Sequence, residues 1–175
     1  MSTNNILIHK IFNDNVLEIT LNNPTKRNPL SLQIIISFQK VLDKLKKDKK
    51  IKVVLLKSTG ASFCSGHDLK EVRKYSSSHL KLLDLFKRCS KMMISLREIP
   101  QPVIACVDGI AAAAGCQLVA SCDLAIATKS SYFQTPGVNI GLFCSTPMVA
   151  ISRKIAPKDM MYMLLTGEKI TAQQA

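Results

Sequence analysis

The sequence predicts an α/β fold, because short β-type runs alternate with amphipathic helical segments along nearly the whole chain. Of its 175 residues, 47% are hydrophobic, which is enough for one substantial core, so we expect a single domain over residues 1–175. Aromatic residues make up only 5% and tryptophan is absent, so the core is expected to be mainly aliphatic.

The first half of the chain begins with two predicted strands, residues 6–11 and 15–21, joined by a hairpin turn. A helix is expected from Leu32 to about Lys47, because apolar residues recur at helical spacing and Ser31 can cap its N-terminus. A buried strand over residues 52–57 should follow. The next segment, 58–71, is expected to be a loop that enters a short helix.

The second half continues the alternation. A helix is predicted over residues 78–98, with its apolar face formed by Leu80, Leu83, Phe86, Met93 and Leu96. The remaining expected elements are a buried strand (103–107), a turn of small residues leading into a helix at Gln117, an apolar run (124–127), a short strand (131–135), helices at 148–155 and 158–165, and a helical turn capped by Thr171.

Charge and cysteine content limit the possible partners. The net charge is +12, which suits a polyanion such as nucleic acid, an acidic membrane surface or a phosphate-bearing small molecule. The six cysteines show no paired spacing and there are only three histidines, so we expect no disulfide framework, no metal site and no separate cofactor.

The sequence shows no membrane or targeting signal. Residues 1–12 lack the basic and apolar regions of a secretory signal, and no transit peptide rich in arginine and serine is visible. No apolar tract is long enough to span a bilayer. We therefore expect a cytoplasmic protein without a membrane span, with the mitochondrion as the alternative compartment.

Two segments could carry chemistry. Residues 102–128 predict a strand, a small-residue turn and a helix N-terminus, which together present backbone N–H groups to an anionic oxygen. The alternative is that the small residues only allow tight packing. The loop at residues 62–70 also follows a strand and enters a helix. If the two segments lie side by side, their N–H groups could form an oxyanion hole.

These segments resemble a known family. The motifs FCSGHDLKE (63–71), DGIAAAAGCQLVASCDLAIA (108–127), FQTPGVNIGLF (133–143) and NNPTKRNPLS (22–31) are together similar to the crotonase, or enoyl-CoA hydratase/isomerase, superfamily. The resemblance implies a spiral of ββα turns with two roughly perpendicular sheets, a homotrimer, and a coenzyme A thioester as ligand. Family members continue for several helices beyond the segment matched here, so the resemblance implies a C-terminally truncated form of the fold.

The resemblance also implies the site residues. The thioester oxygen would be held by the backbone N–H groups of His67 and Ala114, and coenzyme A would enter only as part of the substrate. Its nucleotide end would contact Lys26, Arg27, Ser65, Gly66, Asp68, Leu69 and Lys70. Such a protein would act as an acyl-CoA-binding enzyme of fatty-acid metabolism, or alternatively as a non-catalytic acyl-CoA binder.

The sequence departs from the hydratase pattern at both glutamate positions, which here hold Gln117 and Gly137. Hydration needs a base to activate water and an acid to protonate the α-carbon, and neither residue supplies one. We therefore expect ordinary enoyl-CoA hydration to be crippled. Gln117 could orient a water or the substrate, or only satisfy the interior of its helix.

Four other features have alternative interpretations. The His67 imidazole could be a base but is better explained as a hydrogen-bonded loop residue. Asp68 is better explained as an N-cap, and Cys64 as a small buried thiol. The lysines at 40–57 predict a solvated face. Because one crotonase relative binds AU-rich RNA through a lysine-bearing helix, RNA association is the rival interpretation.

Overall fold

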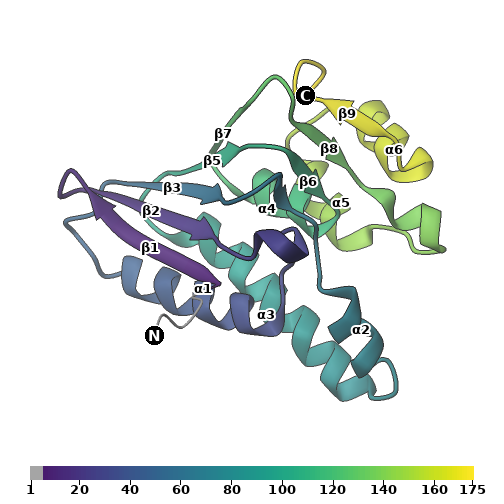
Figure 1. The fold of residues 1–175 in the computed structure, drawn as a ribbon, viewed down its shortest axis with the longest axis horizontal. Helices are drawn as coiled ribbons and strands as arrows, with labels where there is room; N and C mark the ends of the chain where they lie inside the picture. Colours follow the sequence, from purple (N-terminus) through teal and green to yellow (C-terminus); the bar gives the residue numbers. More distant parts are fainter. Residues whose placement is uncertain (1–5) are drawn as a thin grey trace.

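The computed structural model describes residues 6–175, which form two sheets flanked by helices (Figure 1). The larger sheet contains β1 (Leu7–Phe12), β2 (Val16–Leu21), β3 (Val53–Ser58), β5 (Val103–Val107) and β7 (Leu124–Ala127), in the order β1-β2-β3-β5-β7. The smaller sheet contains β4 (Ser62–Cys64), β6 (Ile110–Ala112), β8 (Tyr132–Gln134) and β9 (Lys169–Thr171), in the order β4-β6-β8-β9. The helices are α1 (Leu32–Leu45), α2 (Leu69–Tyr75), α3 (His79–Glu98), α4 (Ala114–Ser121), α5 (Ser145–Ile151) and α6 (Pro157–Thr166), with 3-10 turns η1 (Pro24–Lys26) and η2 (Pro136–Ile140).

The strands and helices follow one repeating pattern. From β3 onward, each repeat places one strand in the larger sheet and the next strand in the smaller sheet before a helix begins: β3-β4-α2, β5-β6-α4 and β7-β8-α5. Within the larger sheet β2, β3, β5 and β7 are parallel, and only the β1–β2 hairpin is antiparallel. Parallel neighbours need a crossover connection, which the second strand and the helix of each repeat provide. The predicted ββα spiral is confirmed.

The main core lies between the larger sheet and the pair α1 and α3, which run side by side (Figure 1). Helix α1 forms as predicted, because Ser31 Oγ accepts a hydrogen bond from the Ile34 N–H and the apolar positions face inward. The side-chain amide of Gln39 on α1 donates to Ser95 Oγ on α3 at 3.0 Å, which fixes the two helices against each other. Fully buried aliphatic side chains fill most of this core, with Phe38 and Phe63 as large aromatic members.

Several predictions about elements were wrong. Residues 62–64 and 110–112 were expected in loops but form β4 and β6. Each strand is too short to show strand periodicity in the sequence and forms by pairing with its neighbours in the smaller sheet. Helix α4 begins at Ala114 rather than Gln117. Residues 169–171 form β9 against β8, although Thr171 Oγ1 does accept a hydrogen bond from the Gln174 N–H.

The predicted apolar face of α3 was also partly wrong. Leu80 and Leu83 are 77% and 37% exposed. The buried side of α3 is instead formed by Leu85, Cys89, Met92, Met93, Ser95 and Leu96. Two leucines near the N-terminal end of the helix therefore face solvent.

Three further observations concern the larger sheet, the helices and metal binding. Strand β7 is an edge of that sheet, and all of its residues are exposed. Within residues 6–175, no helix combines the length and the apolar character needed to cross a membrane. The same residues contain no cluster of side chains suited to a metal ion.

Candidate active site

The two segments singled out in the sequence lie in direct backbone contact. Because β4 and β6 are parallel neighbours, the chain leaves both strands at the same edge of the smaller sheet. A Cβ atom added at Gly66 would lie 3.2 Å from the Ala114 nitrogen, and one added at Gly115 would lie 2.2 Å from the Cys64 carbonyl oxygen. Only glycine allows this approach at either position. The loop that carries His67 therefore lies against the start of α4.

Both backbone N–H groups of interest are available to a ligand. Ala114 is the first residue of α4, so its N–H has no acceptor within the helix and lies at the positive end of the helix dipole. In the described part of the chain, neither this N–H nor that of His67 donates a hydrogen bond to another residue. Both N–H groups are therefore without an acceptor among residues 6–175.

Ala113 is a residue that the sequence did not reveal. Its backbone has φ +49° and ψ −116°, a conformation that alanine rarely adopts and that typically costs about 1–3 kcal/mol. The strain is held in place because the Ala113 N–H donates to the Gln134 carbonyl oxygen on β8 at 2.8 Å. Nothing in a run of four alanines distinguishes this one. Its strained turn sets the direction in which the Ala114 N–H points.

The His67 imidazole is neutral and partly enclosed. Its ring meets the ring of Phe86 edge to face, with 4.9 Å between centroids. Burial lowers the pKa of His67 to about 4, against a smaller opposite effect from a hydrogen bond to the Leu30 backbone. Its Nδ1 atom is buried and has no hydrogen-bond partner in residues 6–175. An imidazole with so low a pKa is a weak general base at neutral pH.

Asp68 caps α2, as predicted. Its Oδ1 accepts hydrogen bonds from the N–H groups of Lys70, at 2.9 Å, and Glu71, at 3.4 Å. Leu69 and Lys70 are exposed on the first turn of that helix. The Asp68 carboxylate is therefore committed to the helix N-terminus.

The structure brings the two predicted nucleotide-binding segments together. The Ser65 N–H donates to the Arg27 carbonyl oxygen at 3.1 Å, and the Leu30 N–H donates to the Gly66 carbonyl oxygen at 2.7 Å. Lys26 and Arg27 expose their side chains next to this junction. Three cationic side chains, those of Lys26, Arg27 and Lys70, are thus carried by adjoining backbone.

The side chain that holds this junction was missed in the sequence. Asn28 is fully buried, and its amide donates to the carbonyl oxygens of Thr59 and Ser62 at 2.8 and 2.7 Å. Its own backbone has φ +51°. An asparagine before a proline reads in sequence as an ordinary turn residue, so no signal marked this one.

The two positions that hold glutamate in hydratases differ in the space around them. Gln117 lies in the first turn of α4, is 8% exposed, and its Oε1 atom is buried with no partner among the described residues. A Cβ atom at Gly137 would lie 2.6 Å from the Leu142 carbonyl oxygen and 2.8 Å from Cys144 Sγ. Position 137 therefore has no room for any side chain.

Cys64 does not form a catalytic pair with His67. Burial raises the pKa of its thiol to about 12, and the side chain is fully buried. The interpretation of Cys64 as a small buried thiol is confirmed.

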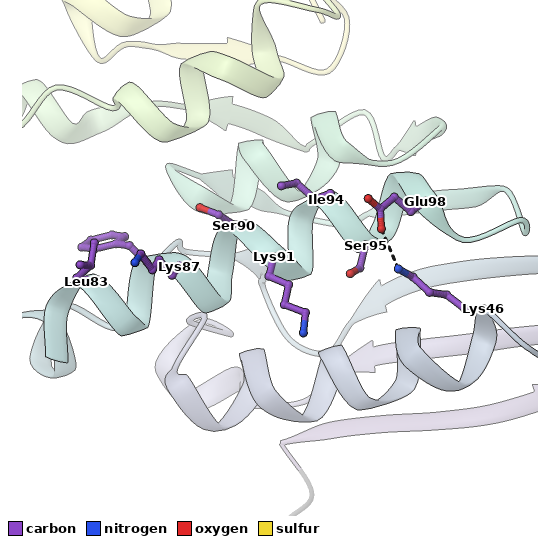
Figure 2. A pocket seen from close by; sticks show the side chains of 9 residues that line it. Lys46, Leu83, Lys87, Ser90, Lys91, Ile94, Ser95 and Glu98 are labelled. Carbon is purple, nitrogen blue, oxygen red and sulfur yellow. Dashed lines mark hydrogen bonds and ion pairs between the residues drawn. The ribbon is translucent and has the colours of Figure 1, made fainter. Parts of the chain in front are cut away.

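Two hollows border helices α3 and α4. A groove of about 500 Å³ runs along α3 beside α1 (Figure 2). Its lining includes Phe86, whose ring touches that of His67. A larger hollow of about 970 Å³ lies among α4, α5, α6 and β7 and includes Cys116. Residues 67, 114 and 117 line neither hollow.

The comparisons with known proteins identify the family. A family model described as enoyl-CoA hydratase/isomerase matches residues 11–175. The chain belongs to the enoyl-CoA hydratase/isomerase family. It is 49% identical over 160 residues to the Danio rerio protein named enoyl-CoA hydratase domain-containing protein 3, mitochondrial, covering 91% of this chain and 55% of that protein. The Homo sapiens protein of the same name is 49% identical over 162 residues, covering 93% and 53%.

Solved structures of the enoyl-CoA hydratase/isomerase family show the same fold. An enoyl-CoA hydratase from Mycobacterium smegmatis superimposes with a TM-score of 0.94 at 44% identity, over 97% of this chain and 66% of that one. The human enoyl-CoA hydratase domain-containing protein 3 gives a TM-score of 0.92 at 46% identity, with the same coverage. The predicted family and fold are confirmed, and the chain spans about half the length of the curated relatives it matches.

Proposed function

We propose that this chain forms the acyl-CoA-binding part of an enoyl-CoA hydratase/isomerase-family protein that polarises the thioester carbonyl between the N–H groups of His67 and Ala114. The observation that carries the proposal is the contact between Gly66 and Ala114, where an added Cβ would lie 3.2 Å from the Ala114 nitrogen. Two unpaired N–H donors on adjoining backbone would stabilise the enolate that forms when the α-carbon loses a proton.

The charged groups around this junction support coenzyme A as the ligand. Lys26, Arg27 and Lys70 expose cationic side chains where η1 meets the start of α2, and the phosphates of coenzyme A are anionic. Ser65, Gly66 and Leu69 complete the proposed contact surface. No separate cofactor is part of the proposal.

Ordinary hydration is not part of this proposed function. Gln117 cannot take a proton from water at neutral pH, although its unpaired Oε1 could accept a hydrogen bond from a water or the substrate. The second acid–base position is closed, because a Cβ at Gly137 would overlap the Leu142 carbonyl oxygen. A reaction that needs only a polarised carbonyl fits the site better than one that needs two carboxylates.

The setting of this activity is also a proposal. The relatives named enoyl-CoA hydratase domain-containing protein 3 are described as mitochondrial, which favours the mitochondrion over the cytoplasm that the sequence suggested. Membership of the family supports a role in fatty-acid metabolism and assembly as a homotrimer.

The decisive experiment removes one donor without changing any side chain. Replacement of the Ala114 peptide bond by an ester, through incorporation of the α-hydroxy analogue of alanine, deletes that N–H and weakens the Ala113 carbonyl as the acceptor of the Gln117 N–H. Exchange of the α-protons of butyryl-CoA in D₂O, followed by NMR, is expected to fall about 10²–10³-fold. The same replacement at Ala172, whose N–H donates to the Ser131 carbonyl oxygen at 3.0 Å outside the proposed site, is the matched control. It should lower stability and leave exchange by the folded protein nearly unchanged.

Binding measurements separate the alternatives. If acyl-CoA binds but α-proton exchange never exceeds that in buffer, the non-catalytic binder is correct and the catalytic proposal is wrong. That second candidate is favoured by the uncharged residues at 117 and 137. If calorimetry detects no binding of coenzyme A or acyl-CoA, both are refuted.

Hydration provides an independent check. The Gln117→Glu variant restores one carboxylate, but Gly137 still provides no partner. Crotonyl-CoA hydration should therefore remain far below that of ordinary hydratases in both wild type and variant. Turnover at ordinary rates in the wild type would show that the role assigned to Gln117 and Gly137 is wrong.

A further inference from the structure

Helix α3 carries a stripe of residues along one side, most of them exposed and none of them a proposed contact of the thioester. Eight residues of α3 line the groove beside α1, and their spacing places them on one side of the helix (Figure 2). They are Leu83, Phe86, Lys87, Ser90, Lys91, Ile94, Ser95 and Glu98. Along this stripe the cationic pair Lys87 and Lys91 lies between the aliphatic residues Leu83 and Ile94.

The cations of this face are largely uncompensated. Glu98 forms an ion pair with Lys46 across the groove at 2.8 Å, which the dashed line in Figure 2 marks. Lys87 and Lys91 form no ion pair with any residue in the 6–175 range. Lys40 and Lys44 on α1 and Lys47 just after it are also exposed, together with one acidic residue of that helix, Asp43. The face formed by α1 and α3, here called the α1–α3 face, therefore carries a local excess of positive charge.

The same stripe exposes large aliphatic side chains. Leu80 is 77% exposed, Leu83 is 37% exposed and Ile94 is 54% exposed. Leu80 precedes Leu83 by three positions, so it extends the stripe by one helical turn. An amphipathic helix with aliphatic residues flanked by lysines is the pattern that binds in the plane of a membrane interface.

We propose that the α1–α3 face docks peripherally onto a bilayer that contains anionic lipids. Leu80, Leu83 and Ile94 would enter the headgroup region, and the lysines would contact lipid phosphates. Charge complementarity identifies the partner as anionic. The exposed aliphatic side chains favour lipid over RNA, since they offer no stacking surface for bases. The one aromatic residue on the stripe, Phe86, has its ring against His67.

The first test compares vesicles with the 175-residue chain. Co-sedimentation should be weak with phosphatidylcholine vesicles and about 10-fold or more stronger when phosphatidylserine is included. Binding should decline as salt is raised, because surface charges are screened. Equal binding to both kinds of vesicle would overturn the proposal.

Charge-reversal variants locate the surface. The double variant Lys87→Glu/Lys91→Glu should lose about 10-fold in vesicle binding. The matched control, Lys129→Glu/Lys158→Glu, makes the same change in net charge at exposed lysines after β7 and on α6, away from α3 (Figure 1). If the two double variants lose binding equally, the α1–α3 face is not the docking surface.

The aliphatic contact has its own test. Because the chain has no tryptophan, Leu80→Trp introduces a single fluorescent reporter at an exposed position. Its emission should shift to shorter wavelength with phosphatidylserine vesicles, and Leu80→Ser/Ile94→Ser should weaken binding at high salt. If emission stays unchanged and single-stranded RNA binds with loss only in the lysine variants, the face is a nucleic-acid surface and the lipid proposal is wrong.

Discussion

Gly115→Ala tests the contact on which the candidate site depends. In an ordinary helix this change stabilises by about 1 kcal/mol. Here the new Cβ would lie 2.2 Å from the Cys64 carbonyl oxygen and 3.0 Å from both the Cys64 carbonyl carbon and Cβ. Ordinary contact begins at 3.4 Å, so β4 and α4 must separate by 3.4 − 2.2, or about 1.2 Å. Such overpacking costs about 1–3 kcal/mol, and therefore outweighs the gain in helix propensity.

The same separation would move the two proposed donors apart, because His67 follows Cys64 and Ala114 precedes Gly115. We therefore expect a lower free energy of unfolding in urea together with a larger loss of α-proton exchange than stability alone explains. The control is Gly141→Ala, where a Cβ meets nothing within 4 Å and only the backbone strain of φ +74° is added. If Gly115→Ala is as stable as wild type, the close approach of β4 and α4 is wrong.

Two further predictions concern titratable groups. The pKa of His67 is about 4 in the folded protein and about 6.5 for an unperturbed histidine, so the unfolded chain binds more protons between these values. The stability gained from the neutral imidazole is complete above about pH 6.5 and declines by up to about 3 kcal/mol as the pH falls to 4. Urea unfolding across this range should show the decline, and His67→Gln should remove it. Thiol accessibility should follow burial: Cys64 and Cys116, with pKa values raised to about 12, should resist alkylation at neutral pH. The half-buried Cys106 and Cys144 should react first, as mass spectrometry would show.

The long periodic elements were predictable from the sequence. The sequence indicates both the N-cap and the buried face of helix α1, because Ser31 precedes apolar residues at helical spacing. The small residues of the turn that includes Gly115 also indicated close packing, although the sequence could not show which atoms they approach. The smaller sheet was missed because strands such as β4 and β6 are too short to have a period and form only through tertiary pairing.

Other features of the site have no local signal. The strain at Ala113 results from its hydrogen bond to Gln134, which lies on a different strand. The burial of Asn28 depends on carbonyl groups more than thirty residues away, at Thr59 and Ser62. The exposed position of Leu80 follows from where α3 runs relative to α1, since periodicity alone placed it with the core.

The exposed edge at β7 has a consequence for the behaviour of this chain in solution. Leu124 and Ile126 are 60% and 62% exposed, and among residues 6–175 the strand pairs only with β5. Proteins commonly protect such edges with lysine, proline or a bulge, and Leu124–Ala127 contains none of these. We expect aggregation to start when β7 of one molecule pairs with an edge strand of another. The tendency to aggregate would then depend on residues outside the proposed thioester site.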